Sequence, residues 1–215
     1  MPVLDALVRR FARLATNVVV RVPAAWPLFR PGIERQFDYL ASQWDAIRGP
    51  RRPGSFERAL EEVASAPRRA LDVGTGTGRG AFSIAERWPE AEVVGVDVSR
   101  RMVEEARRKM PPELASRLRF EVADASRLPF ADGEFDLVGL ANMIPFFDEL
   151  ARVVAPGGYA VFAFSLGAAT PIYVEGERLR AALAQRGFGQ FTDVREGAGT
   201  GLVARKAERS LPVER

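Results

Sequence analysis

Short apolar runs alternate with helical stretches from residue 69 onward, and this alternation restricts the possible folds more than any other feature. The apolar runs, which we expect to be strands, are Ala70–Val73, Val93–Val96, Leu118–Val122, Phe135–Leu140 and Tyr159–Phe164. The helical stretches between and after them are Gly80–Trp88, Arg100–Met110 and Glu175–Arg186. Strands that read as continuous apolar runs are typical of parallel sheets with helices on both faces. The alternation therefore predicts an α/β fold with a doubly wound, mostly parallel sheet.

The end of the chain predicts two further strands. Gly189–Arg195 and Gly201–Arg205 are joined by the Gly-containing turn at 196–199, which is typical of an antiparallel pair. We therefore expect a seven-stranded sheet with an antiparallel last strand, in a domain that covers residues 69–206. Residues 1–68 are expected to form an N-terminal helical extension, and residues 207–215 a flexible tail.

The N-terminal extension carries its own helical pattern. Apolar residues recur at helical spacing from Leu4 to Val18, and further helical stretches are expected at Glu34–Ile47 and Phe56–Ala64. Helix breakers separate the first two stretches, namely Pro23, Pro27, Pro31 and Gly32. The extension is therefore expected to contain three helices with a break between the first and the second.

The composition excludes several kinds of chemistry. The sequence holds no cysteine and no histidine, so it can form no disulfide, no thiolate or His-ligated metal site and no Ser-His-Asp triad. We expect no metal. The net charge is only +3, and acids are interspersed with the arginines from Glu57 onward, so a nucleic-acid surface is not expected. No apolar run approaches the roughly 20 residues that span a bilayer, and we expect a cytoplasmic protein.

A glycine-rich turn follows the first expected strand, in Leu71-Asp72-Val73-Gly74-Thr75-Gly76-Thr77-Gly78. Glycines at these positions let backbone press against a ligand, and their amides, with the following helix N-terminus, favour a carboxylate or phosphate. The same segment satisfies the G-x-G-x-x-A pattern of dinucleotide-binding proteins. The turn by itself therefore leaves the ligand open.

Three aspartates narrow the choice of ligand. Asp72 lies at the end of the first strand, where a carboxylate suits a nearby ammonium group, such as that of a methionine moiety, and would repel a pyrophosphate. Asp97 ends the second strand, where it can accept hydrogen bonds from both hydroxyls of a ribose. Asp124 follows the third strand, where it can accept from the exocyclic amine of an adenine. The acids favour a nucleoside with a methionine arm.

The sequence resembles the class I S-adenosylmethionine-dependent methyltransferases, particularly the small-molecule branch that includes quinone-biosynthesis C-methyltransferases. Four stretches in family order carry the resemblance: LDVGTGTGRGA at 71–81, VVGVDVSRRMVEEAR at 93–107, VADASRLPFADGEFDLV at 122–138 and RVVAPGGYAVF at 152–162. The resemblance implies a Rossmann-like fold and S-adenosylmethionine as the cofactor. The residues that it assigns to the donor are Asp72, Gly74, Thr75, Gly76, Gly78, Asp97, Val98, Met102, Asp124, Ala125 and Leu140.

Within that resemblance each group has a role. The three glycines of the turn line the methionine end of the donor, and Asp97 holds the ribose. Met102 packs on the adenine, while Asp124 and Ala125 bracket its edge. Leu140–Asn142 line the side of methyl transfer. Pro156-Gly157-Gly158 is the family's turn into the fifth strand.

The segment after the fourth strand departs from the family pattern. The quinone-type branch usually has an Asn, two or three small or apolar residues and then a His, but here Pro145 stands near the expected His. The Asn-Pro-Pro-aromatic motif of amide and adenine N-methyltransferases is also absent. We expect a small, fairly apolar acceptor, in a pocket whose candidate residues are Tyr39, Trp44, Asn142, Met143 and Phe146, with Phe147 and, more weakly, Tyr173. The same aromatic residues could instead belong to the core.

Two questions stay open at this point. The first helix is expected to pack as a lid over the donor site, and the alternative is that it lies on a membrane surface with Arg9, Arg10 and Arg13 toward anionic headgroups. The expected activity is methyl transfer by in-line displacement. The alternatives are a non-catalytic protein that binds S-adenosylmethionine and an NAD(P)-dependent oxidoreductase with a Rossmann fold. The oligomeric state is not predicted.

Overall fold

The computed structural model describes residues 2–49 and 53–208 of the chain. Seven strands form one sheet in the order β3-β2-β1-β4-β5-β7-β6. Their bounds are β1 Arg69–Val73, β2 Glu92–Asp97, β3 Leu118–Val122, β4 Phe135–Ala141, β5 Val154–Phe164, β6 Phe188–Glu196 and β7 Gly199–Lys206. β7 runs antiparallel to both of its neighbours, and the other pairs are parallel. The expected Rossmann-like sheet, with its antiparallel last strand, is confirmed.

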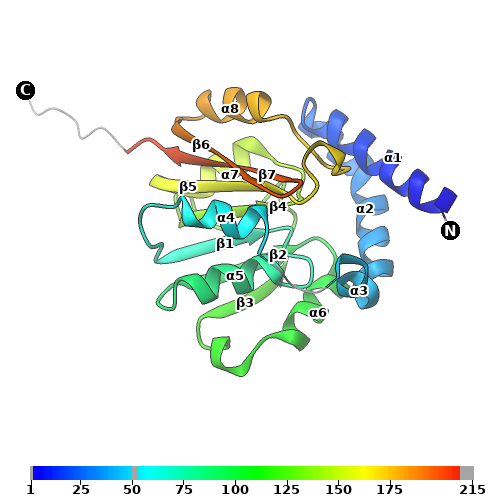
Figure 1. The fold of residues 1–215 in the computed structure, drawn as a ribbon, viewed down its shortest axis with the longest axis horizontal. Coiled ribbons are helices and arrows are strands. Elements are labelled where there is room, and N and C mark those ends of the chain that lie inside the picture. Colours follow the sequence, from blue (N-terminus) through cyan, green and yellow to red (C-terminus); the bar gives the residue numbers. More distant parts are fainter. Residues whose placement is uncertain (1, 50–52, 209–215) are drawn as a thin grey trace, which may run out of the picture.

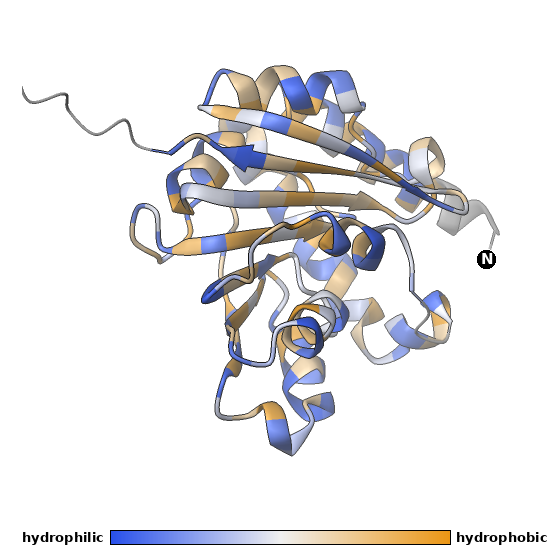
Figure 2. Cartoon of the chain, turned by 60° about the vertical axis from the view of Figure 1, so that its left-hand side comes forward, coloured by the Kyte–Doolittle hydropathy of each residue, from blue (hydrophilic) through white to orange (hydrophobic). Residues whose placement is uncertain are grey.

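Helices cover both faces of this sheet (Figure 1). On one face lie α4 Ser55–Glu61, α5 Arg79–Arg87 and α6 Arg100–Lys109, and on the other lie α7 Phe147–Val153 and α8 Gly176–Ala184. Successive residues of a strand point to opposite faces. Ala70 therefore packs in the core beneath α4, α5 and α6, and Leu71 packs in the core beneath α7 and α8. The central strands are mainly hydrophobic, whereas the helices alternate hydrophilic and hydrophobic residues (Figure 2). Burial on both faces explains the continuous apolar runs of the sequence.

The N-terminal extension lies along one side of the sheet (Figure 1). Up to Arg48 it consists of α1 Pro2–Val19, η1 Pro23–Ala25, α2 Trp26–Leu40, η2 Ala41–Gln43 and α3 Trp44–Arg48. The helix expected at Phe56–Ala64 is α4, which packs on a face of the sheet and not with this extension. Ala15, Val19, Trp26 and Ile33 bury their side chains in the same core as α7 and α8. Within the described residues, no helix combines the length and the hydropathy needed to cross a membrane.

The break expected at Pro27, Pro31 and Gly32 is wrong. Helix α2 begins at Trp26 and runs through all three residues. Pro27 falls in the first turn, where the backbone N–H has no partner within the helix and can be absent. Pro31 removes one backbone hydrogen bond of the helix, and the burial of Trp26 and Ile33 offsets that loss. Gly32 has a packing role, because a Cβ at this position would lie 2.9 Å from the Phe11 ring of α1. The helical stretch expected at Glu34–Ile47 is instead divided by η2 at Ala41–Gln43.

Two details near β5 also differ from expectation. Helix α7 lies where none is expected, and it buries Phe147, Leu150 and Val153. The segment Pro156-Gly157-Gly158 is not a turn that precedes the strand but an irregularity within β5, where the register with β4 shifts. Gly157 has φ +77°, a conformation that favours glycine. Of the expected tail, residues 209–215 lie outside the described residues.

Candidate functional site

The glycine turn connects the end of β1 to α5, as the sequence predicts. Gly74, Gly76 and Gly78 have φ of +70°, +54° and +93°, which other residues rarely adopt. The amides of Gly74 and Thr75 donate to the Val96 carbonyl at 2.8 and 2.9 Å, and the Gly78 amide donates to the Thr75 carbonyl at 2.9 Å. These three amides donate to carbonyls of the protein itself, so the turn offers fewer free amides to a phosphate than its glycine-rich sequence indicates.

Asp72 is enclosed behind the turn and is 1% exposed. The Thr75 hydroxyl donates to its carboxylate at 2.6 Å. Burial raises the pKa of Asp72 to about 7, although hydrogen bonds from Thr75 and from the Ala81 amide act in the opposite direction. A Cβ on Gly80 would lie 2.7 Å from both carboxylate oxygens, so only glycine fits beside them. A buried carboxylate of this kind is stabilised in its charged form by a nearby cation.

Asp97 joins the end of β2 to the glycine turn. One carboxylate oxygen accepts from the Gly76 amide at 2.9 Å, and the other accepts from the Ser99 amide at 2.9 Å. Burial raises the pKa of Asp97 to about 6, and the neighbouring charge of Asp38 acts in the same direction. A carboxylate can accept about four hydrogen bonds. Asp97 therefore keeps acceptor capacity for hydroxyl groups of a ligand.

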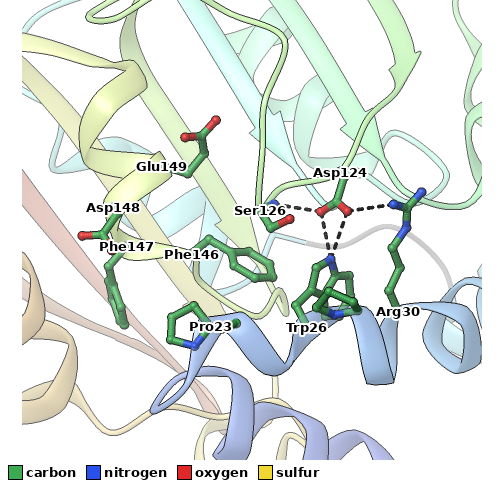
Figure 3. Close-up of a pocket in the computed structure, with 11 residues that line it drawn as sticks. Pro23, Trp26, Arg30, Asp124, Ser126, Phe146, Phe147, Asp148 and Glu149 are labelled. Carbon is green, nitrogen blue, oxygen red and sulfur yellow. Dashed lines mark hydrogen bonds and ion pairs between the residues drawn. The ribbon is translucent and has the colours of Figure 1, made fainter.

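Asp124, beyond the end of β3, is bonded more fully (Figure 3). The Trp26 indole N–H donates to its two oxygens at 2.9 and 3.1 Å. The Ser126 amide donates to the first oxygen at 2.9 Å, and Arg30 forms an ion pair with the second at 3.1 Å. Three donors therefore engage this carboxylate, which has about four acceptor positions, and the single indole N–H is shared between its two oxygens. Trp26 and Arg30 belong to the N-terminal extension, so the extension closes this part of the site.

A cavity of about 410 Å³ lies beside Asp124. Its walls come from η1 and the start of α2, from the loop after β3 and from the start of α7, and the lining residues are Pro23, Ala24, Trp26, Pro27, Arg30, Asp124, Ser126, Phe146, Phe147, Asp148 and Glu149. The rings of Trp26 and Phe146 meet edge to face, with centroids 5.3 Å apart. The cavity therefore combines aromatic walls with a charged rim.

The five acceptor candidates occupy different places. Phe146 lines the cavity, whereas Tyr39 is 74% exposed. Met143 lies over Gly74, where a Cβ would be 2.7 Å from its Sδ, and Trp44 lies over Gly76, where a Cβ would be 3.5 Å from its Nε1. Asn142 has φ +54°, and its side-chain oxygen accepts from the amide and hydroxyl of Ser165 at 2.9 and 3.1 Å. The structure does not bring these five residues into one pocket.

The remaining donor candidates lie at the same edge of the sheet. Val98 separates Asp97 from Ser99, which caps α6 by accepting from the Met102 amide at 3.1 Å. Met102 itself is fully buried. Ala125 and Leu140 line a small apolar cavity of about 10 Å³ under the site. Of the two further aromatic candidates, Phe147 lines the larger cavity, and Tyr173, the weaker candidate, packs edge to face on Phe164.

Two aspartates of the extension fasten it to the glycine turn and α6. Asp38 accepts from the Ser99 hydroxyl at 2.6 Å and from the Arg101 amide at 3.2 Å. Asp45 accepts from the Thr77 hydroxyl at 2.7 Å and from Lys109 at 2.8 Å. Although burial acts to raise it, the pKa of Asp45 is lowered overall by these hydrogen bonds.

The contacts of Trp26, Arg30, Asp38 and Asp45 were not expected from the sequence. Trp26 and Arg30 are spaced i, i+4, which places them on one helical face. That spacing is the sequence signal for Trp26 and Arg30, but Pro27 and Pro31 predict a break and so obscure the helix.

The strand order defines a Rossmann-like α/β domain, and the acids at the strand ends mark a candidate ligand site at the carboxyl edge of the sheet. Residues 70–158 match the family model described as a methyltransferase domain. The match covers less than half of the chain, and over this stretch the chain is similar to methyltransferases, among them enzymes of quinone biosynthesis.

Several named methyltransferases are similar to this chain over part of their length. The chain is 38% identical over 141 residues to a demethylmenaquinone methyltransferase of Deinococcus radiodurans, which covers 60% of this chain and 58% of that protein. It is 35% identical over 156 residues to the ubiquinone/menaquinone biosynthesis C-methyltransferase UbiE of Geotalea daltonii, which covers 66% and 65%. With a malonyl-[acyl-carrier protein] O-methyltransferase of Halorhodospira halophila it shares 36% identity over 61% of this chain and 47% of that protein. The matches thus span about half to two-thirds of these relatives.

Solved structures show the same fold. A SAM-dependent methyltransferase from Aquifex aeolicus superposes with a TM-score of 0.60 at 20% identity, over 72% of this chain and 90% of that one. The [4+2]-cyclase SpnF superposes with a TM-score of 0.65 at 18% identity, over 82% and 96%. At these identities the likeness concerns the fold alone.

Proposed function

We propose that this protein binds S-adenosylmethionine at the carboxyl ends of β1, β2 and β3 and transfers its methyl group to a small, fairly apolar acceptor. One observation carries the proposal. Asp72, Asp97 and Asp124 end or follow three adjacent strands, and neighbouring strands lie about 4.8 Å apart. The acids thus form a row, in the order in which the donor presents its ammonium group, its ribose hydroxyls and its adenine amine.

The chemistry of the turn favours this donor over a dinucleotide. A pyrophosphate needs free amides and positive charge, but the amides of Gly74, Thr75, Gly76 and Gly78 donate within the protein. Asp72 lies behind the turn with a raised pKa, so a second negative charge there would be repelled. The ammonium group and the sulfonium of the donor would instead favour the ionised carboxylate.

Arg48 supplies positive charge near the same end of the site. Burial and the neighbouring Arg79 lower the pKa of Arg48, while Asp45, Glu57 and Asp72 attract its positive charge. Its guanidinium lies 6.0 Å from the centre of the Trp44 ring, which packs on the glycine turn. Asp72 and Arg48 thus place opposite charges at this end of the site, which suits an amino acid moiety with its carboxylate toward Arg48 and its ammonium group toward Asp72.

S-adenosylmethionine supplies a methyl group already activated by its sulfonium, so the protein needs mainly to align the two reactants and exclude water. Trp44 and Met143 cover the glycine turn and are placed to exclude water from the methionine arm. The chain contains no histidine, so an acceptor that must lose a proton would lose it to a carboxylate, to a tyrosine or to solvent.

We also propose that the extension is a lid. Arg9 and Arg13 donate to the carbonyls of Ala168, Ala169 and Thr170, which favours packing against the protein over contact with anionic headgroups. Leu7 and Leu14 are 57% and 56% exposed on the same helix. Co-sedimentation with anionic vesicles, compared between the wild type and a Leu7→Glu/Leu14→Glu variant, tests the membrane alternative. Equal and negligible partitioning supports the lid.

The activity is tested with methyl-labelled donor. The names of the relatives provide two acceptor chemistries, a demethylated menaquinone and a malonyl group on acyl carrier protein. We expect label in one small-molecule product with the wild type and at least tenfold less with Asp97→Ala. If the protein binds the donor but labels neither these acceptors nor any component of a metabolite extract, transfer is excluded and the donor-binding alternative replaces it.

A further inference from the structure

Side chains of the extension contact both oxygens of Asp124 in this structure, and this distinguishes it from Asp97, whose carboxylate accepts from amides of its own domain. Its first oxygen accepts from Trp26 and Ser126, and its second contacts Trp26 and Arg30. A carboxylate has about four acceptor positions. Three donors already engage it, so an adenine amine that approaches from the side of the extension would compete with Trp26 and Arg30.

The three donors differ in how readily they can leave Asp124. The Ser126 amide is two residues from Asp124 in the same loop, so it is held in place by the chain. Trp26 and Arg30 lie on the first turns of α2, 98 and 94 positions away in the sequence. The Arg30 side chain is 46% exposed, so it can leave at little cost. Trp26 is 4% exposed and is the stronger competitor.

We propose that Trp26, assisted by Arg30, forms a latch that competes with the adenine amine for Asp124, so that donor binding requires release of the start of α2. The indole N–H occupies the carboxylate in place of the exocyclic amine. The inference rests on the proposed function, because it assumes that Asp124 recognises adenine.

The surroundings allow such a movement. The cavity of about 410 Å³ adjoins Trp26 and is walled by Pro23 and Pro27 on the side of the extension (Figure 3). Trp26 can turn into this space while Asp38 and Asp45 keep the rest of the extension on α6 and the glycine turn. The latch therefore opens locally, and the lid stays attached.

Titration calorimetry with S-adenosylhomocysteine tests the latch in the full-length protein. Trp26→Phe removes the indole donor and keeps an aromatic ring against Phe146. Because a hydrogen bond to a charged group is worth about a factor of ten in an equilibrium, we expect the Kd to fall about tenfold. Arg30→Met should lower it about twofold. Arg35→Met, an exposed arginine on the same helix, is the matched control and should leave the Kd unchanged.

S-inosylhomocysteine, which carries an oxo group in place of the amine, separates the latch from general loosening. The latch predicts that Trp26→Phe improves binding of the adenosyl ligand but not of the inosyl ligand. An unchanged or weaker affinity for S-adenosylhomocysteine in Trp26→Phe, or an equal gain for both ligands, overturns the latch and leaves the proposed function standing. If neither the wild type nor Trp26→Phe binds S-adenosylhomocysteine at millimolar concentration, the proposed function itself fails.

Discussion

The two ends of the candidate donor site are built in different ways. At the methionine and ribose end, Asp72, the glycine turn and Asp97 bond to one another within the Rossmann-like domain, as in the contact between Gly76 and Asp97, 21 residues apart. At the adenine end, Asp124 is bonded to Trp26, 98 residues away in the extension. The first end is made by the domain and retains acceptor capacity, whereas the second is closed by a different part of the chain.

One chain thus carries both the candidate site and the segment that covers its adenine end. Under the proposed function, the glycines and acids at the strand ends bind the polar groups of the ligand, and the extension controls access to Asp124. Variants in the two ends should therefore fail differently.

Asp72→Asn should change the pH dependence of stability most strongly. Burial raises the pKa of Asp72 from its ordinary 3.8 to about 7 in the folded protein. Its contribution to the free energy of unfolding is therefore fully present below pH 3.8 and is lost as the pH rises through 7. In the wild type, the contribution of Asp72 to the free energy of unfolding should fall by about 2–3 kcal/mol between pH 5 and pH 8. Urea denaturation of both proteins at the two pH values measures it. The same pH dependence in the wild type and in Asp72→Asn would show that folding does not raise the pKa of Asp72.

Asp97→Ala should weaken S-adenosylhomocysteine binding by about 1–3 kcal/mol, the scale of lost charge-assisted hydrogen bonds. The reason is that Asp97 still has acceptor positions for the ribose hydroxyls. Calorimetry measures the loss, with Asp132→Ala as the control, because Asp132 is 80% exposed and pairs with Arg152 away from the turn. Unchanged affinity in Asp97→Ala would remove the ribose assignment and with it the contrast with Asp124.

Met143→Phe should reduce donor affinity about tenfold, since overpacking typically costs 1–3 kcal/mol. Met143 already lies where a Cβ on Gly74 would be 2.7 Å away, so a rigid ring would block the methionine arm, whereas the flexible thioether can move aside. Met143→Leu is the volume-matched control and should change affinity little. Equal affinities for Phe and Leu would place the methionine arm elsewhere.

Asp38→Ala should have the smallest effect and should lower the free energy of unfolding by about 0.5–1.5 kcal/mol. Its carboxylate holds the extension to Ser99 and Arg101 but contacts none of the three acids of the site by a hydrogen bond. Hydrogen exchange should become faster in residues 26–48 and stay unchanged in β1 and β2. Faster exchange throughout the sheet would show that the extension and the domain unfold together.

The sequence predicted the domain and its end of the site because each signal there is local. The apolar runs gave the strands, and Gly74, Gly76 and Asp97 stand at strand ends, where topology alone places them together. The extension was predicted less well, because Pro27 and Pro31 lie inside α2 and tertiary burial of Trp26 overrode their propensity. The bonds of Asp124 to Trp26 and Arg30, and the separation of Tyr39 from the cavity, depend on long-range packing that periodicity does not encode.

The central claim is that this edge of the sheet recognises a sulfonium nucleoside and not a diphosphate. Calorimetric titration of the wild-type protein with S-adenosylhomocysteine and, separately, with NADH tests it most directly. The account predicts saturable binding of S-adenosylhomocysteine and no measurable binding of NADH at millimolar concentration. Saturable binding of NADH, or none of S-adenosylhomocysteine, would contradict it.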